Sequence, residues 1–217
     1  MNVDLVVLAG GQGRRMGRRL KPMLEAQGET LLARALRVWP GRRAFVVAPL
    51  ELHEQLGAES LPARSGGLRF VADEGRGPAQ AVVAAARAST AKWLLVAAAD
   101  HPAPARSLAE TLARWAQDAD GAAVRDQSGR LQPLPSVLSR SGVLECTGAV
   151  RLGRLLASMR IAELSWERLS DGERGALLDV DTVEDARAQG IDPSSAPRLA
   201  SAEVSVETRA GGPRRRS

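Results

Sequence analysis

Short apolar runs alternate with amphipathic stretches through the first half of the chain. Runs that are apolar almost throughout, as in strands buried on both faces of a sheet, cover residues 3–9, 43–48, 68–73 and 92–100. Apolar residues at helical spacing follow these runs, in residues 31–38, 50–57, 78–88 and 104–118. Because strands and helices alternate in this way, the pattern predicts an α/β fold of the Rossmann-like, three-layer kind, with a mostly parallel sheet and helices on both faces.

The pattern changes after residue 118. Residues 121–138 predict two strands joined by a turn at 128–130, and a helix around 152–159 and a strand near 161–169 follow. Residues 177–190 predict the end of a strand and a last helix. Residues 191–217 are polar and lack periodicity, so we expect one domain over residues 1–190 and a disordered tail over residues 191–217.

Composition and charge exclude several classes of protein. The formal charge of +5 includes a local +3 from five arginines and two glutamates after residue 197, which leaves about +2 for the rest of the chain. That charge is too small for a nucleic-acid-binding surface, and 3% aromatic residues with no tyrosine provide few stacking platforms. The single cysteine, Cys146, cannot form an internal disulfide, and no apolar run reaches the roughly 20 residues of a membrane helix. Since the first residues also lack the pattern of a signal peptide, we expect a cytoplasmic protein without membrane or nucleic-acid partners.

A glycine-rich, basic segment follows the first predicted strand. Gly10, Gly11 and Gly13 stand at the carboxyl end of that strand, where ligands of parallel sheets bind and where missing side chains let backbone N–H groups approach an anion. The segment that follows carries enough positive charge to bind several phosphates, on Arg14, Arg15, Arg18, Arg19 and Lys21. Met16 replaces the glycine that a dinucleotide fingerprint requires, and no Walker A triplet occurs. The alternative to a phosphate site is a plain glycine turn before a solvated basic helix.

Two further positions add candidate chemistry to this segment. Lys21 is one of only two lysines among 30 basic residues, which favours a need for a compact ammonium group at that position. Asp100 ends the predicted strand at 92–100, where it is placed to hold Mg²⁺, since this ion binds one or two carboxylates together with substrate phosphates. The alternative for Asp100 is to cap the helix that follows. We expect His101, beside Asp100, to have no chemical role and His53 to lie at the surface.

An acidic run near residue 180 is the last candidate. Asp179 and Asp181 are candidates for metal contact, with the alternative that Asp181 or Thr182 caps the last helix. We expect Glu184 and Asp185 to complement the dipole of that helix.

Five segments between residues 3 and 190 form an ordered set of motifs: LAGGQGRRMGRRLKPML at 8–24, DEGRGPAQAVVAA at 73–85, VAAADHPAP at 96–104, LQPLPSVLSR at 131–140 and DVDTVEDA at 179–186. Together, and in this order, they resemble the molybdenum cofactor guanylyltransferases, a family with the nucleotidyltransferase fold. Each motif alone is weak, and the ordered set is what carries the resemblance.

The resemblance implies an activity and a set of site residues. The reaction is attack by the terminal phosphate of molybdopterin, with or without molybdenum, on the α-phosphorus of GTP, with Mg²⁺ as cofactor and with molybdoenzymes or their chaperones as candidate protein partners. The nucleotide pocket is implied at Leu8, Ala9, Gly10, Gly11, Gly13, Lys21, Asp73 and Asp100. Arg15 and Lys21 are implied to act on the triphosphate and, with Asp100, to be catalytic; Asp73 is implied on the guanine side. Asp100 is implied as the Mg²⁺ ligand, together with Asp179 or Asp181.

The chain also departs from the family pattern. Leu20 stands where the family has an acid before the motif lysine, and the closing motif is Asp-Val-Asp, which also occurs in related cytidylyltransferases. The choice between GTP and CTP is therefore open, although Gly77-Pro78 resembles the guanylyl branch. Two different functions also stay open, namely transfer to a sugar 1-phosphate and non-catalytic binding of nucleotide or pterin.

Overall fold

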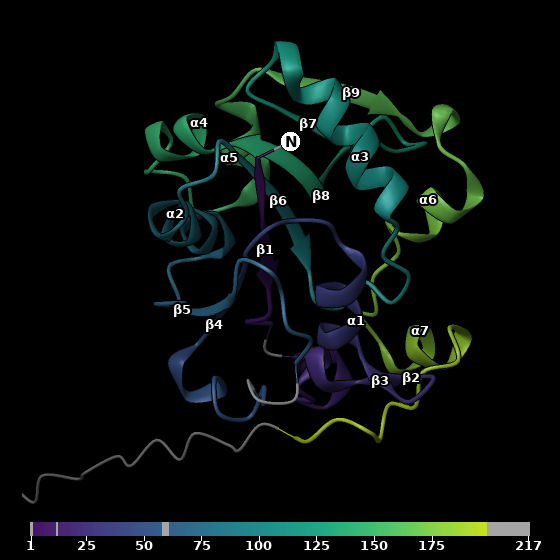
Figure 1. Cartoon of the computed structure of the whole chain (residues 1–217). Helices are drawn as coiled ribbons and strands as arrows, with labels where there is room; N and C mark the ends of the chain where they lie inside the picture. The colour runs from purple at the N-terminus through teal and green to yellow at the C-terminus, as the bar shows by residue number, and fades with distance from the viewer. Residues whose placement is uncertain (1, 12, 58–60, 199–217) are drawn as a thin grey trace, which may run out of the picture.

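Seven strands pair into one central sheet in the computed structural model, which describes residues 2–11, 13–57 and 61–198 (Figure 1). In sheet order the strands are β5 (Leu68–Ala72), β4 (Ala44–Ala48), β1 (Val3–Leu8), β6 (Trp93–Ala98), β8 (Leu131–Ser139), β7 (Gly121–Arg125) and β9 (Ile161–Ser165). Of these seven, only β8 runs antiparallel to its neighbours. The mostly parallel sheet that the alternating pattern predicts is therefore confirmed.

Helices cover both faces of this sheet. On one face lie α2 (Pro78–Ala88), α4 (Arg140–Glu145) and α5 (Leu152–Ala157); on the other lie α1 (Leu31–Val38) and α3 (Arg106–Trp115) (Figure 1). Alternate residues of β1 enter different cores, because successive side chains of a strand point to opposite faces: Leu5 and Val7 pack on the α1 and α3 side, whereas Val6 packs on the α2 side. The predicted three-layer fold is confirmed.

Some local predictions are confirmed and others are wrong. Thr30 caps α1 by accepting a hydrogen bond from the Ala33 N–H at 3.2 Å. The helix expected over residues 50–57 is only the 3-10 turn η3 (Leu50–Leu52), and no strand forms within residues 177–182. The pattern also missed α4, α6 (Asp171–Gly175) and the small hairpin of β2 (Glu25–Ala26) and β3 (Glu29–Thr30), which are too short to show periodicity.

Residues 191–198 do not belong to a disordered tail. They follow the last helix, α7 (Val183–Ala188), and form two isolated antiparallel β-bridges through their backbone. One pairs Asp192 with Glu25, and the other pairs Arg198 with Arg19. Ile191 and Ala196 are buried in a third apolar cluster, together with Met16, Leu24 and Val180 among others. The packed part of the chain therefore extends past the expected boundary at residue 190, at least to residue 198, and the rest of the expected tail, 199–217, lies outside the described residues.

No helix within the described ranges combines the length and the apolar character needed to cross a membrane.

Candidate active site

A cleft of about 560 Å³ crosses the carboxyl ends of the parallel strands. Among the residues expected in the site, it is lined by Leu8, Gly10, Gly11, Asp73, Asp100 and Asp179. These residues follow or end β1, β5 and β6 or precede α7, so segments distant in sequence meet at one edge of the sheet, as expected for an α/β fold. Ala9, Gly13, Arg15, Lys21 and Asp181 are not part of the cleft lining.

The three glycines after β1 serve different purposes. A Cβ on Gly10 would lie 3.0 Å from Oδ2 of Asp73, so the missing side chain lets this carboxylate approach the loop. A Cβ on Gly11 would meet no described atom within 4 Å, which leaves the backbone of Gly11 open to the cleft. Gly13 has a φ of +53°, and a Cβ there would lie 2.1 Å from the Arg19 carbonyl oxygen. Gly13 therefore shapes the turn rather than the cleft lining.

Lys21 is held between two carboxylates at the side of the cleft. Its Nζ donates to Oδ1 of Asp181 at 2.6 Å and to Oδ2 of Asp100 at 3.2 Å. Burial lowers the pKa of Lys21, but the hydrogen bonds and charges of Asp181 and Asp100 outweigh this effect, so the pKa lies above its ordinary value. The ammonium group is therefore charged throughout the neutral range.

Arg15 reaches the same acidic residue from the outside. Its guanidinium lies 3.4 Å from Oδ2 of Asp181, and its side chain is 75% exposed. An exposed ion pair of this kind contributes little to stability. The basic segment thus brings one buried cation, Lys21, and one long, exposed cation, Arg15, to the same side of the cleft.

The possible helix-capping roles differ between Asp100 and the acidic run. The residue before α3 is Ala105, with no side-chain cap, so Asp100 is not an N-cap. Thr182 caps α7 and Asp185 completes the capping box, which confirms the capping role considered for Thr182. Because Thr182 fills this role, the carboxylate of Asp181 is left to bind Lys21 and Arg15.

Carboxylates outnumber buried cations at this point of the structure. Burial raises the pKa of Asp179, and the neighbouring Asp181 and Asp100 raise it further, whereas His101 and Lys21 lower it. Within the described residues, no three His, Cys, Asp or Glu side chains converge closely enough to hold a metal ion, and the Lys21 ammonium lies between Asp100 and Asp181 instead. The cleft nevertheless contains two carboxylates, Asp100 and Asp179, and carboxylate oxygens are ligands that a hard divalent cation such as Mg²⁺ binds.

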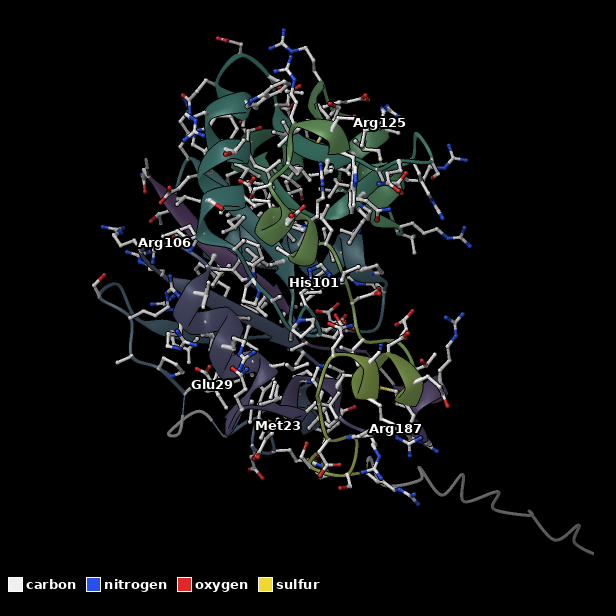
Figure 2. The ribbon with its side chains drawn as sticks, turned by 90° about the vertical axis from the view of Figure 1, so that its right-hand side faces the viewer. Met23, Glu29, His101, Arg106, Arg125 and Arg187 are labelled. Atoms are coloured by element: carbon white, nitrogen blue, oxygen red, sulfur yellow. The ribbon has the colours of Figure 1, made fainter. Side chains whose placement is uncertain are left out.

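His101 is buried at the cleft, and His53 is less exposed than expected. His101 is only 5% exposed, lines the cleft and lies at the middle of the side of the molecule shown in Figure 2. Its Nδ1 is 3.0 Å from the Ala176 carbonyl oxygen, which can only accept, so Nδ1 carries the proton. Burial lowers the pKa of His101 and keeps the ring neutral at pH 7. His53 is half-buried, with Nε2 3.0 Å from the Ala48 carbonyl oxygen, rather than at the surface.

Leu20 cannot replace the acid that the family has at its position. Its side chain is fully buried in the apolar core on the α1 side of the sheet. The acids that accompany Lys21 in this chain are therefore Asp100 and Asp181, which come from distant segments.

The opposite wall of the cleft comes from a bulge in β8, which was not predicted from the sequence. Val124 of β7 pairs with Gln132, whereas the preceding Ala123 pairs with Ser136, so residues 133–135 of β8 leave the ladder. Two of these three residues are prolines, which lack the N–H that a ladder needs. Gln132, Pro133 and Leu134 line the cleft as a result. These residues belong to the motif at 131–140, and its two prolines are the sequence signal from which the bulge could have been predicted.

Comparisons with known proteins agree with this geometry. Residues 5–163 match the family model described as the MobA-like NTP transferase domain. A molybdenum cofactor guanylyltransferase from Pseudomonas putida is 36% identical over 63% of this chain and 70% of its own length. A probable molybdenum cofactor guanylyltransferase from Opitutus terrae is 34% identical over 82% of this chain and 90% of its own length.

A solved structure shows the same fold. Molybdopterin-guanine dinucleotide biosynthesis protein A from Archaeoglobus fulgidus superposes with a TM-score of 0.69 at 21% identity, over 86% of this chain and 96% of that one. Since the family model spans more than half of the chain and a relative above 30% identity covers most of it, the family is established. The chain belongs to the MobA-like NTP transferase family, alongside relatives named molybdenum cofactor guanylyltransferases.

Proposed function

We propose that this protein transfers GMP from GTP to the terminal phosphate of molybdopterin and releases pyrophosphate. The observation that carries the proposal is the cleft at the carboxyl edge of a parallel sheet, where the glycine loop after β1 lies beside Lys21 and its two carboxylates, Asp100 and Asp181. The names of the curated relatives supply the substrates, GTP and molybdopterin.

The chain's own residues support the transfer by binding and by electrostatics. An oxygen of the acceptor phosphate attacks the α-phosphorus of GTP, and the bond to the bridging oxygen of pyrophosphate breaks. The open backbone at Gly11 receives phosphate oxygens, while the charges of Lys21 and Arg15 stabilise the negative charge that grows on pyrophosphate. No nucleophilic side chain is required for this reaction.

Asp100 is the proposed ligand of a Mg²⁺ ion, with Asp179 or Asp181 as its second carboxylate. When bound, Mg²⁺ neutralises phosphate oxygens as a Lewis acid. Asp100 and Asp179 line the cleft, and the pKa of Asp179 is raised first by burial and then by the negative charges of Asp181 and Asp100. A cation at this point would therefore relieve repulsion among the three carboxylates.

The side of the cleft next to β5 is the proposed place of the guanine base. Asp73 follows β5 and approaches the Gly10 backbone, so its carboxylate can accept hydrogen bonds from N–H groups of a base while the glycine loop holds the phosphates. Guanine offers such N–H donors on adjacent atoms.

The Asp100→Asn variant tests the proposed function against simple nucleotide binding. We expect the variant to fold, because the substitution keeps the volume and Asp100 caps no helix, and to lose transfer of GMP to molybdopterin at saturating Mg²⁺. Wild-type protein that binds GTP but never transfers GMP would refute the proposed function. A variant with wild-type turnover would refute the assignment of the metal ligand.

A further inference from the structure

Gln132 lines the cleft, and Asp126 fixes the orientation of its side-chain amide. The Nε2 of Gln132 donates to Oδ2 of Asp126, and an ionised carboxylate can only accept, so the amide nitrogen is the atom turned to Asp126. Within the described part of the chain, Oε1 of Gln132 accepts no hydrogen bond, although the residue lines the cleft. A free, pre-oriented acceptor is thus available to a ligand.

Asp126 is itself locked in one position by the turn between β7 and β8. Its Oδ1 accepts from the Ser128 N–H at 2.8 Å, from the Ser128 hydroxyl at 2.7 Å and from the Arg130 N–H at 2.9 Å. All three donors occupy the same oxygen, which leaves Oδ2 for Gln132. The turn therefore dictates which end of the Gln132 amide remains for the cleft.

The position of Gln132 in the sheet indicates which substrate it meets. Because β8 runs antiparallel to β6, the first residues of β8 lie at the carboxyl end of β6. Four strand spacings separate β5, which Asp73 follows, from β8, so the two walls are about 19 Å apart. With the nucleotide base on the Asp73 side, the β8 side is left for the second substrate.

We infer that Gln132 is a specificity-determining residue for the acceptor substrate, and that Asp126 is the positioning residue that presents its Oε1 to an N–H donor on the acceptor's pyrimidine ring. This inference rests on the proposed function, since it takes molybdopterin as the acceptor. The guanine of GTP carries the same kind of N–H edge as the pyrimidine ring of molybdopterin. Separate KM values for GTP and for molybdopterin therefore show which of the two rings Gln132 binds. The neutral oxygen of Gln132 can only accept a hydrogen bond. It therefore disfavours a phosphate group at this place, because a phosphate has no hydrogen-bond donor at neutral pH apart from a residual hydroxyl.

The Asp126→Asn variant tests the inference without changing any atom that touches substrate. The side-chain oxygen of the new asparagine must face the three donors of the turn, so its NH₂ group faces Gln132. The Gln132 amide must then reverse, so that Oε1 accepts from this NH₂ group and Nε2 is left for the ligand. We expect the KM for molybdopterin to rise by about 3- to 10-fold, the effect of one lost neutral hydrogen bond, with kcat and the KM for GTP unchanged.

A second substitution should restore a hydrogen-bond acceptor at position 132. In the Asp126→Asn/Gln132→Glu double variant, one carboxylate oxygen at position 132 accepts from the new amide and the other replaces the lost Oε1. We expect the KM for molybdopterin to return toward the wild-type value, which a merely structural role of Asp126 would not produce. Gln132→Met removes both polar atoms at similar volume and should raise the same KM, which keeps the test decisive if the turn variant does not fold.

Asp192→Asn is the matched control. Asp192 holds a similar turn through the Ser194 N–H and hydroxyl, both at 2.7 Å, but does not line the cleft, so its substitution should leave both KM values unchanged. An unchanged KM for molybdopterin in Asp126→Asn and Gln132→Met, a shift only in the KM for GTP, or a failed rescue would overturn the inference. Wild-type protein that transfers no GMP at all would instead refute the proposed function.

Discussion

At the scale of single residues, the proposed site contains Lys21, one of only two lysines among 30 basic residues. The rarity of lysine in the sequence singled out Lys21, and the structure places its ammonium between Asp100 and Asp181. Asp181 was expected as a metal ligand or helix cap, and its contact with Lys21 spans 160 positions of the sequence. No pattern of spacing or periodicity predicts such a contact, because it depends on how distant loops meet at the edge of the sheet.

Substitution of the two lysines separates the role of the site cation from that of total charge. We expect Lys21→Met to lower kcat/KM for GMP transfer by at least about 100-fold, because the substitution removes the buried cation that we propose stabilises the leaving pyrophosphate. Lys92→Met removes the same charge and the same volume beside Trp93, away from the cleft, and should leave kcat/KM unchanged. Equal losses in the two variants, measured by steady-state kinetics, would mean that Lys21 has no special role.

At the scale of elements, the loop after β1 has a backbone conformation that requires glycine at position 13. The φ of +53° at Gly13 and the close Arg19 carbonyl mean that any side chain there must distort the turn. The basic residues of the loop are held near the cleft by this turn and by the packing of Met16 in the third apolar cluster.

We expect Gly13→Ala to lower the free energy of unfolding by about 1–3 kcal/mol, since it forces alanine into a left-handed, crowded conformation. Urea denaturation measures this change. Gly11→Ala is the matched comparison, because the added Cβ meets no described atom within 4 Å; it should leave the free energy of unfolding nearly unchanged and raise the KM for GTP. If Gly13→Ala were as stable as Gly11→Ala, the turn would not need glycine.

The turn between β7 and β8 predicts a pH dependence of stability. Hydrogen bonds from Ser128, Arg130 and Gln132 lower the pKa of Asp126 from 3.8 to about 2. Because the folded-state pKa is depressed, the stabilisation is present above about pH 4 and is lost as the pH falls toward 2. The wild type should therefore have a higher Tm than Asp126→Asn at neutral pH, and this difference in Tm should shrink as the pH falls from about 4 to 2. A difference that stays constant down to pH 2 would contradict this account.

At the scale of the whole molecule, the third apolar cluster connects the site to the end of the described chain. Ile191 packs there with Met16 from the basic loop and with Val180, which lies between Asp179 and Asp181. A segment that was expected to be part of a tail thus packs against the basic loop and against the residue between Asp179 and Asp181.

We expect Ile191→Ala to lower the free energy of unfolding by about 2–5 kcal/mol, because Ile191 is only 2% exposed and its truncation leaves a cavity. Leu50, which is 68% exposed, provides the control, and Leu50→Ala should change the free energy of unfolding by no more than about 0.5 kcal/mol. Urea denaturation of both variants checks the prediction. Similar values for the two would mean that residues 191–198 add nothing to the fold.

The sequence predicted more of the fold than of the site. Continuous apolar runs and helical patterns identified long elements such as α2, whose bounds match the expected residues 78–88, because these elements are extensively buried. Short helices such as α4 and α6 and the packing of residues 191–198 left no pattern of their own, and only the prolines at 133 and 135 mark the bulge. In the site, Asp73 and Asp100 lie at the cleft as expected, but the pairing of Gln132 with Asp126 depends on side-chain geometry and was missed. The catalytic, nucleotide-binding and metal-binding roles assigned to individual residues stay predictions, as does the cytoplasmic location.

The most direct measurement is transfer of labelled nucleotide to molybdopterin, with and without molybdenum, from GTP and from CTP in parallel and with or without Mg²⁺. We expect a dinucleotide product from GTP that requires Mg²⁺, and little or none from CTP. Equal or faster transfer from CTP would contradict the assignment of the base. Absence of transfer from both nucleotides in the presence of Mg²⁺ would contradict the proposed function itself.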